Sequence, residues 1–440
     1  MAKLVYDKNG RLLFTKEMKK EYTLLIPQML PIHFAMLEKC LKLHGYSCET
    51  LTSNHRGIVD TGLKYVHNDT CYPALLVIGQ FIEAVNSGEY DKNKVALLIT
   101  QTGGGCRASN YIHLLRRALK KAELDFVPVI SLNLSGLEKN PGFTLSIKMI
   151  RQFIYAIMYG DILMLLINQC RPYEKHKGST DALAKRWEDR LVGEFRLPGK
   201  LSYREMVKNF KRIVADFSSI ERMGEPKVRV GIVGEIYIKY SPLGNNNLEA
   251  FLLSEGAEPV VPGLIDFLIF KINNRDVDVD LYGGSRLKKT VVGIFQRYAE
   301  KCQKAMIEAI KKNPDFRAPS PFSSIRELAK DYLGPGNKMG EGWLLTGEML
   351  ELIHEGTNNI ICTQPFGCLP NHIVGKGMIR RLKDDYPESN IVAIDYDPGA
   401  TKINQENRIK LMLANAKRKP SIAADTAIPS GREYEKQHIG

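Results

Sequence analysis

The chain has 440 residues, of which 44% are hydrophobic and 25% are charged, as in an ordinary globular protein. A chain of this length is expected to form two or three domains and to bury a core without disulfides or structural metals. Its 62 Lys and Arg residues outnumber its 49 Asp and Glu residues, which gives a net charge of +13. These basic residues are dispersed along the chain, so nucleic acid is not expected to be a partner, and the excess fits a basic surface or a pocket for an anionic substrate.

The sequence predicts no membrane span. The longest apolar run, residues 153–167, is interrupted by Tyr159, Gly160 and Asp161 and is shorter than the roughly 20 residues that a span needs. The first residues carry charges but no long apolar stretch, so no signal peptide is expected. These features predict a cytoplasmic protein.

The first part of the chain alternates short apolar runs with helical patterns. Strands are predicted at 22–27, 48–52, 95–100 and 127–132, and helices at 31–44, 73–87 and 108–122. The run VALLIT at 95–100 is apolar throughout, which is typical of a strand buried on both faces of a parallel sheet. Residues 1–140 are therefore predicted to form a first α/β unit.

Residues 141–222 are predicted to be mainly helical, with amphipathic stretches near 145–167 and 203–217. A second α/β unit with a helical insertion is predicted for residues 223–416. Its strands are expected at 228–234, 258–261, 359–363 and 391–395, and its main helices at 285–312, at 343–354, after Pro370 and up to Ala416. Residues 417–440 have little hydrophobic pattern and are predicted to be a flexible tail.

Eight cysteines are spread over the chain, and no two form a CxxC pair, so the spacings of zinc ribbons and ferredoxins are absent. Cys71, Cys106 and Cys368 lie in NDTCYPA, QTGGGCRASN and QPFGCLPNH, each directly before a predicted helix. Turns of this kind lie at the carboxyl edge of a parallel sheet, where ligands bind. A helix N-terminus also lowers the pKa of a thiol, which favours the thiolate that metals need. From the residue pattern alone, metal binding and core packing remain equally open for these three, whereas core packing is predicted for the other five.

Glycines stand beside two of these cysteines and are candidate cofactor-binding residues: Gly103, Gly104, Gly105 and Gly367. Glycine lets the backbone adopt positive φ angles and approach a bulky group closely. The same glycine-rich turn could instead cradle a phosphate at a helix N-terminus. QTGGGCRAS, however, matches neither the phosphate loop nor the dinucleotide fingerprint, so a nucleotide site is the second interpretation.

Four segments, NDTCYPALLVIGQFI (68–82), QTGGGCRASNYIHLLRRAL (101–119), GEIYIKYSPLGNN (234–246) and QPFGCLPNHIVGKGM (364–378), resemble the 2-hydroxyacyl-CoA dehydratase superfamily. The resemblance is to its branch of activator-associated and double-cubane-cluster proteins, and it covers roughly residues 20–415. It implies two Rossmann-like (flavodoxin-like) parallel-sheet units with helical insertions and an iron–sulfur cluster, 4Fe-4S or double cubane, in the cleft between them. It also implies that Cys71, Cys106 and Cys368 are the cluster ligands.

The resemblance further implies a reductase or dehydratase-like component that receives low-potential electrons from a separate ATP-hydrolysing activator with its own cluster. Such a chain would be an ATP-dependent reductase or a 2-hydroxyacyl-CoA dehydratase-like lyase, and it would form a homodimer or a heterodimer with a related subunit. Two alternatives stay open. One is a non-catalytic electron carrier or cluster scaffold, and the other is a metal-free regulatory module that binds a nucleotide or CoA.

Four polar residues are weaker candidates for the substrate space or for hydrogen bonds to cluster sulfurs: Glu235, His372, Arg171 and Glu174. Such bonds help to set a reduction potential. The competing interpretation for each is an ordinary ion pair or helix cap.

Overall fold

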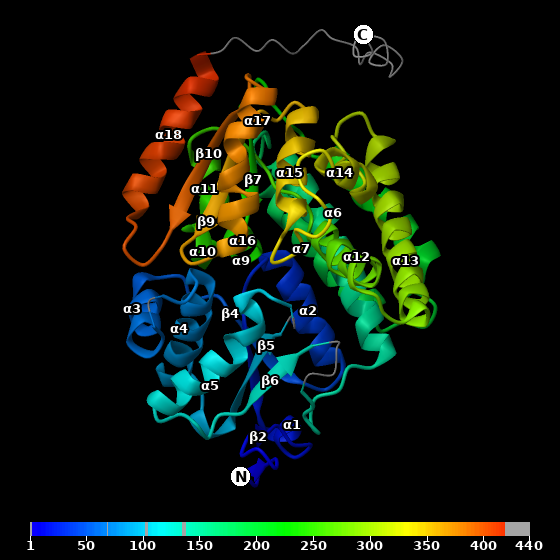
Figure 1. The fold of residues 1–440 in the computed structure, drawn as a ribbon. Helices are drawn as coiled ribbons and strands as arrows, with labels where there is room; N and C mark the ends of the chain where they lie inside the picture. Colours follow the sequence, from blue (N-terminus) through cyan, green and yellow to red (C-terminus); the bar gives the residue numbers. More distant parts are fainter. Residues whose placement is uncertain (1, 68, 102–103, 134–137, 419–440) are drawn as a thin grey trace.

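The computed structural model describes the chain except for residues 1, 68, 102–103, 134–137 and 419–440. In the described residues, two four-stranded sheets are covered by helices, and the sheet built from the first part of the chain lies below the other in Figure 1. All neighbouring strands within each of these sheets are parallel. The predicted α/β class with parallel sheets is therefore confirmed.

The first sheet has the strand order β4-β3-β5-β6. Its strands are β3 (Thr23–Pro27), β4 (Ser47–Leu51), β5 (Val95–Thr100) and β6 (Val129–Leu132). The helices of this part are α1 (Met18–Glu21), α2 (Pro31–Leu43), α3 (Arg56–Tyr65), α4 (Tyr72–Asn86) and α5 (Tyr111–Lys121), with 3-10 turns η1 (Lys92–Lys94) and η2 (Arg107–Asn110). A small antiparallel pair, β1 (Val5–Tyr6) and β2 (Leu12–Leu13), precedes them.

The second sheet has the order β10-β9-β7-β8. Its strands are β7 (Arg229–Gly234), β8 (Glu258–Val260), β9 (Asn359–Pro365) and β10 (Asn390–Tyr396). Short helices follow β7, namely α9 (Ile236–Tyr240), α10 (Pro242–Asn245) and α11 (Leu248–Ser254). Around β9 and β10 lie α15 (Trp343–His354), α16 (Leu369–Val374), η3 (Lys376–Met378), α17 (Ile379–Asp385) and α18 (Lys402–Arg418). The predicted tail from residue 419 lies outside the described residues.

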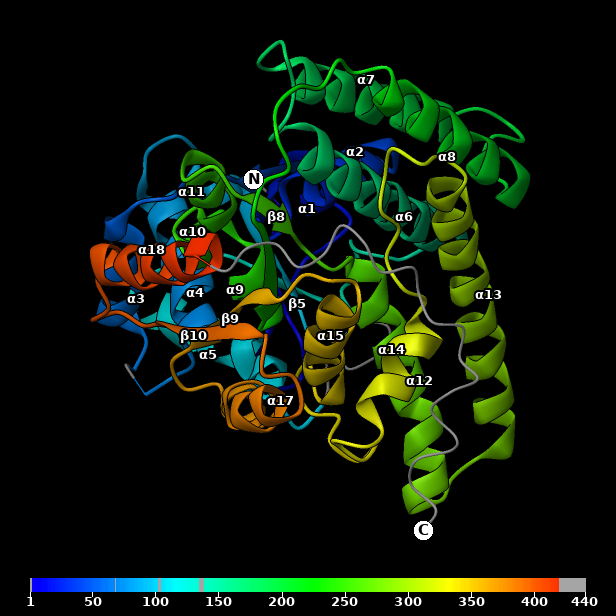
Figure 2. The same ribbon diagram turned by 90° about the horizontal axis from the view of Figure 1, so that it is seen from above.

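The remaining helices form a layer of their own, gathered on one side of the two sheets in Figures 1 and 2. They are α6 (Ile147–Cys170), α7 (Ser179–Glu194), α8 (Tyr203–Ser218), α12 (Leu264–Tyr282), α13 (Arg286–Lys311) and α14 (Phe322–Ala329). Their apolar faces share one hydrophobic cluster with side chains of α2 and α15. The helical segment and the helical insertion, which are far apart in the sequence, therefore pack as one layer.

One helix of the described residues, α6, is long and apolar enough to cross a membrane, but 67% of its most apolar window is buried inside the protein. Most of this apolar window therefore packs inside the protein. Gly160 and Asp161, which interrupt its apolar run, have structural partners. A Cβ at Gly160 would lie 2.4 Å from the Cδ2 atom of His33, and Asp161 Oδ1 bonds His33 Nε2 at 2.8 Å. Asp161 also accepts the backbone N–H groups of Leu264 and Ile265, each at 2.8 Å, at the start of α12.

Both sheets have the same topology. If the strands of each sheet are numbered along the chain, each has the order 2-1-3-4. The second strand lies on one side of the first strand, and the third and fourth strands lie on the other. The direction of the connections therefore changes between the first and third strands, which are β3 and β5 in one sheet and β7 and β9 in the other. In open α/β sheets, ligands bind outside the carboxyl ends of the strands at this switch point.

Helix α3 was not predicted from the sequence. It packs tightly on α4 through two glycines: a Cβ at Gly62 would lie 2.4 Å from the Leu75 carbonyl oxygen, and one at Gly79 would lie 2.2 Å from that of Ile58. Because α3 intervenes, Cys71 follows a helix, and the expectation that all three loop cysteines share a strand-to-helix turn is wrong for this one.

Candidate functional site

Cys71, Cys106 and Cys368 are contributed by both α/β units and come together. Cys71 is the N-cap residue of α4, Cys106 follows β5 and precedes η2, and Cys368 follows β9 and precedes α16. Electrostatic interactions connect Cys106 with each of the other two. Since β5 and β9 are the third strands of the two sheets, the switch points of both sheets meet at these thiols.

The loops that carry Cys71 and Cys368 lie against each other. The Tyr72 backbone N–H donates to the Phe366 carbonyl oxygen at 3.0 Å. Between these cysteines stands Gly367, whose φ is +75°, and a Cβ there would lie 3.0 Å from the Cys71 Cα. Glycine therefore satisfies two requirements at position 367, a left-handed backbone and a close approach of two loops.

The Cys106 loop is attached to the same neighbourhood. The Arg107 guanidinium donates to the Asp69 carbonyl oxygen at 2.6 Å, and the Cys71 sulfur lies 2.8 Å from the Tyr111 hydroxyl oxygen. A Cβ at Gly105 would lie 2.7 Å from the Met339 sulfur, so the loop also touches the segment before α15. Gly104 has open space around it, and Gly103 lies outside the described residues.

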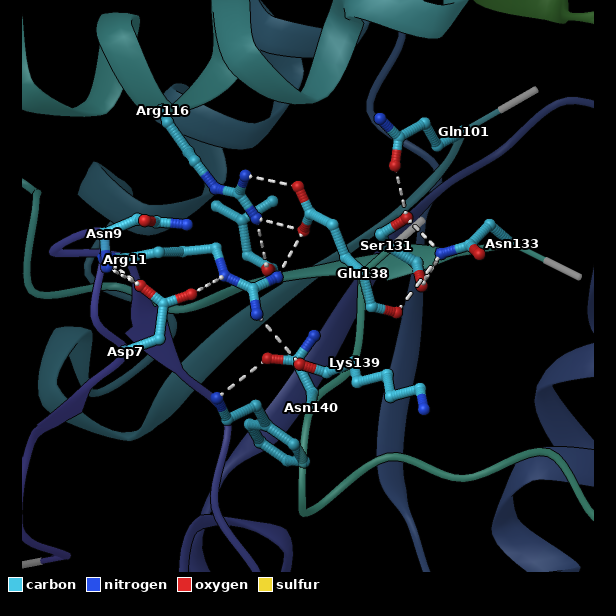
Figure 3. Close-up of polar contacts among 12 residues, drawn as sticks. Asp7, Asn9, Arg11, Gln101, Arg116, Ser131, Asn133, Glu138, Lys139 and Asn140 are labelled. Atoms are coloured by element: carbon cyan, nitrogen blue, oxygen red, sulfur yellow. Dashed lines mark hydrogen bonds and ion pairs between the residues drawn. The ribbon is translucent and has the colours of Figure 1, made fainter. Parts of the chain in front are cut away.

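The start of this loop is anchored by a polar network (Figure 3). The Ser131 hydroxyl donates to Gln101 Oε1 at 2.8 Å, and the Asn133 amide donates to the Ser131 hydroxyl oxygen at 2.7 Å. These bonds tie the carboxyl end of β5 to that of β6. Gln101 is the last described residue before the gap at 102–103, so the network holds the carboxyl end of β5 in place.

A second anchor in Figure 3 is Glu138. Its carboxylate accepts from Arg11 at 2.7 Å and from both terminal nitrogens of Arg116, at 2.8 and 2.7 Å. Burial opposes ionisation, but the two guanidinium groups outweigh it and lower the pKa of Glu138. The ion pairs connect the N-terminal segment and α5 to the chain that follows β6.

Two carboxyl groups lie beside the thiols. Glu235, directly after β7, accepts the Ile238 N–H at 3.0 Å, and Glu341 Oε1 accepts the Ile236 N–H at 3.0 Å. Burial and the neighbouring Glu341 raise the pKa of Glu235 to about 8. The other oxygen of Glu341 is buried and has no hydrogen-bond partner among the described residues. Because a buried polar atom normally has a partner, this oxygen is available to a bound group.

A half-buried lysine completes the surroundings. Lys271 of α12 bonds the Gly340 carbonyl oxygen, and its Nζ lies 4.8 and 5.1 Å from the ring centres of Phe267 and Phe270. Burial lowers the pKa of Lys271, while Glu341 and Cys106 oppose that shift. Lys271 therefore places an amine next to Cys106 and Glu341.

The net shift of the thiol pKa values is upward, although helix N-termini were expected to lower them. Burial raises the pKa of Cys71 to about 11, and it raises the pKa values of Cys106 and Cys368 as well. Glu235 adds to the effect at all three, because a nearby carboxylate disfavours a thiolate. The backbone N–H groups at the helix starts act in the opposite direction but are weaker. Metal binding at this site would have to displace the thiol protons.

The three thiols do not form a site for a single metal ion. Among the described residues, no group of three His, Cys, Asp or Glu side chains is placed to hold one metal ion. An iron–sulfur cluster instead takes each thiolate on a different iron. Three buried or half-buried cysteines from separate loops, together with a glycine that permits close approach, match that donor set and leave one corner of a cubane without a ligand from these three.

The other cysteines are core residues, as predicted. All five are buried and belong to hydrophobic clusters: Cys40, Cys48, Cys170, Cys302 and Cys362. Cys71 and Cys368 are also buried, but they lie outside the four clusters of the described residues. This difference distinguishes the candidate ligands from cysteines that fill space.

The four polar candidates have different surroundings. Glu235 lies with the thiols, whereas His372 is exposed on α16. Arg171 pairs with Asp181, with its Nε 3.1 Å from the carboxylate. Glu174 caps α7 by accepting from the backbone of residues 178 and 180 at 2.7 and 2.9 Å. For Arg171 and Glu174, the structure shows the ion pair and the helix cap that the sequence left open.

The sequence did not single out Glu341, Lys271 or Tyr111. Glu341 lies in a loop whose glycines carry no motif, and Lys271 lies within a long helix, so only tertiary packing brings them to the cysteines. No protein-family model matches this chain, and no curated protein matches it either.

Proposed function

We propose that this chain holds an iron–sulfur cluster on Cys71, Cys106 and Cys368 and receives low-potential electrons from a separate ATP-hydrolysing activator. The observation that carries the proposal is the convergence of three thiols from both α/β units at the switch points of their sheets. The four segments that resemble the 2-hydroxyacyl-CoA dehydratase superfamily contain Cys71, Cys106, Glu235 and Cys368. Segments far apart in the sequence thus supply one site, which supports a shared origin.

The finer description of the fold belongs to the same proposal. Both sheets have the strand order 2-1-3-4 of flavodoxin-like units, so each unit is interpreted as Rossmann-like. The cluster would lie between the two units, held by two cysteines of the first and one of the second. When bound, it supplies one-electron chemistry at low potential. The protein's own part is to hold it, to surround it with Lys271 and Tyr111, and to limit access of water.

We favour an enzyme over an electron carrier. An unpartnered, buried carboxyl oxygen of Glu341 beside the thiols serves no need of a carrier, whereas a polar group of a substrate would satisfy it. The activity would be an ATP-dependent reduction or a dehydratase-like elimination. We further propose a cytoplasmic homodimer, because three thiolates leave one position of a cubane to an outside ligand or to a bridge between clusters.

The first test is anaerobic purification followed by iron and sulfide analysis and EPR. Cys71→Ala, Cys106→Ala and Cys368→Ala should each lower bound iron severalfold, whereas the core variants Cys40→Ala and Cys302→Ala should retain it. Full iron retention in the Cys368 variant would remove this residue from the ligand set. A wild-type protein without iron would favour the metal-free regulatory module.

A second test concerns electron delivery. The cluster signal is followed after mixing with a mild donor, with and without an activator and ATP. Reduction should require both, because a buried cluster resists added negative charge. Complete reduction by the mild donor alone would contradict the ATP-coupled role, and reduction without turnover of any substrate would favour a carrier.

A further inference from the structure

A series of buried acidic side chains leads away from the cysteine site along α15. Glu348 and Glu351 of this helix are 2% and 4% exposed, and Asp266 of α12 is 3% exposed. Glu355, directly after α15, is half-buried. Positions 348, 351 and 355 share one face of a helix, so these carboxyl groups follow one another along it. We call Asp266, Glu348, Glu351 and Glu355 the interior carboxyl row.

The row has fewer cations than carboxyl groups. Lys239, itself 3% exposed, donates to both oxygens of Glu348 at 2.9 and 3.1 Å. Asp266 accepts instead from the Gln303 amide at 2.5 Å. Glu351 accepts from the Ser320 backbone N–H, and Glu355 from the Ser320 hydroxyl, each at 2.8 Å. Neutral donors cannot balance a buried negative charge, so the row favours bound protons.

Members of the row interact with one another and with the site. Glu348 interacts electrostatically with Glu341, which borders the thiols, and Asp266 interacts with both Glu348 and Glu351. Glu351 interacts in turn with Glu355 at the outer end. Burial raises the pKa of Asp266 to about 8 and also raises the pKa values of Glu348, Glu351 and Glu355. The series thus connects the cysteine site with the protein surface.

Other charged and titratable groups face the row from the packed elements. Besides Lys239 and Glu341, they are Asp161 of α6, Arg229 of β7, Tyr240 of α9, Lys311 of α13 and Cys362 of β9. The partner of Asp161 is His33 of α2. Asp161 is already engaged by His33 and by two backbone N–H groups of α12. Arg229 and Lys311 face Glu355 and favour its ionised form at the surface end.

We propose that the interior carboxyl row is a proton-loading site that takes up a proton from solvent through Glu355 when the cysteine site is reduced. This inference rests on the proposed function. The one-electron donor is the reduced iron–sulfur activator, or a low-potential chemical reductant in its place. One electron enters, up to one proton is bound by a carboxylate of the row, and no other bond forms or breaks. Proton uptake offsets the negative charge that reduction adds to the interior.

The expected coupling is large enough to measure. Glu348 lies five residues beyond Trp343, where α15 begins, which corresponds to about 8 Å along the helix, and Glu341 lies in the loop before it. One charge added about 10 Å away, across an effective dielectric constant of about 20, raises a carboxyl pKa by about one. Uptake is greatest where the row is partly protonated, which for Asp266 is near pH 8. In that range the midpoint potential should fall as pH rises, and the dependence should weaken at more acidic pH.

The test uses the iron-loaded protein and the metal-free protein. The midpoint potential is measured by EPR-monitored titration on both sides of the Asp266 pKa of about 8. Asp266→Asn and Glu351→Gln keep the size of the side chain and should reduce the pH dependence at least twofold. The control is Glu188→Gln, because Glu188 is also buried, at 7% exposed, but pairs with Lys39 and Lys185. This control should leave the dependence unchanged.

Infrared spectroscopy of the metal-free protein supplies a readout that needs no cluster. At pH 7 a protonated-carboxyl band should be present, should weaken in both row variants and should persist in the Glu188 variant. A pH-independent potential in iron-loaded protein, or no band that the row variants weaken, would overturn the loading role alone. A protein that binds no iron would defeat the proposed function, and the loading role with it.

Discussion

The backbone of Cys71 lies so close to Gly367 that a Cβ at position 367 would be 3.2 Å from the Cys71 nitrogen. Gly367→Ala would also place an alanine at a φ of +75°. We expect this variant to lose about 1–3 kcal/mol of unfolding free energy and most of its bound iron, because the strained loops can no longer meet. Thermal unfolding and iron analysis check both effects.

Gly88→Ala is the matched control for this prediction. Gly88 has a φ of +84°, but a Cβ at this position would have no other atom within 4 Å. This variant should lose unfolding free energy because of backbone strain, but it should keep its bound iron. Equal iron content in the two variants would mean that the contact with Cys71 does not matter for the site.

The buried Asp161 should contribute strongly to stability. It bonds His33 of α2 and two N–H groups at the start of α12, so it connects the first unit with the helical layer. Asp161→Ala leaves these donors buried without a partner, and we expect a loss of about 3–5 kcal/mol in denaturant unfolding. Asp181→Ala, which breaks the exposed pair with Arg171, should cost less than about 1 kcal/mol. Similar losses of unfolding free energy in both variants would mean that burial does not strengthen the contribution of Asp161.

Glu138 should make the protein sensitive to acid. The pKa of Glu138 is lowered in the folded state, so its ion pairs stabilise the fold above the ordinary carboxyl pKa of 4.5. This contribution is lost as the pH falls through the lowered value and the carboxylate takes up a proton. Glu138→Gln should therefore be less stable than the wild type at pH 7, and the two should converge in acid. A difference that is independent of pH would argue against the ion pairs.

The thiols should react slowly before metal is bound. Because burial raises the pKa of Cys71 to about 11, alkylation of metal-free protein should be slow at pH 7 and should accelerate as the pH rises. The Tyr111 hydroxyl opposes this shift, so Tyr111→Phe should slow alkylation of Cys71 further. Mass spectrometry of the labelled peptides measures each cysteine separately. Half-buried Cys106 should react before Cys71, and the opposite order would contradict the burial argument.

Where the sequence pattern is strong and local, the predicted elements match the structure. The apolar run at 95–100 is β5, with the predicted bounds, because a strand buried on both faces needs continuous apolar residues. The helix predicted at 343–354 is α15. Helix α3 was missed because its ten residues owe their packing to glycine contacts with α4, which no local pattern reveals.

The sequence singled out the three cysteines and Glu235 of the candidate site, but neither Glu341, Lys271 and Tyr111 nor the electrostatics. The position before a predicted helix marked Cys71, Cys106 and Cys368, and the resemblance added support for all three. The sign of the thiol pKa shifts was wrong because it depends on burial and on Glu341, which arrives from a distant loop. Long-range placement of charged groups is a property of tertiary packing, and local sequence does not encode it.

The division of the thiols between the two units has a consequence for biosynthesis. Cys368 is made about 300 residues after Cys71, and domains generally fold in the order in which they leave the ribosome. A nascent first unit therefore exposes two of its thiols with no third one to close the site. If the proposed cluster is bound, its insertion has to wait for the second unit, because a chain that ends before β9 would lack Cys368, one of the three proposed ligands.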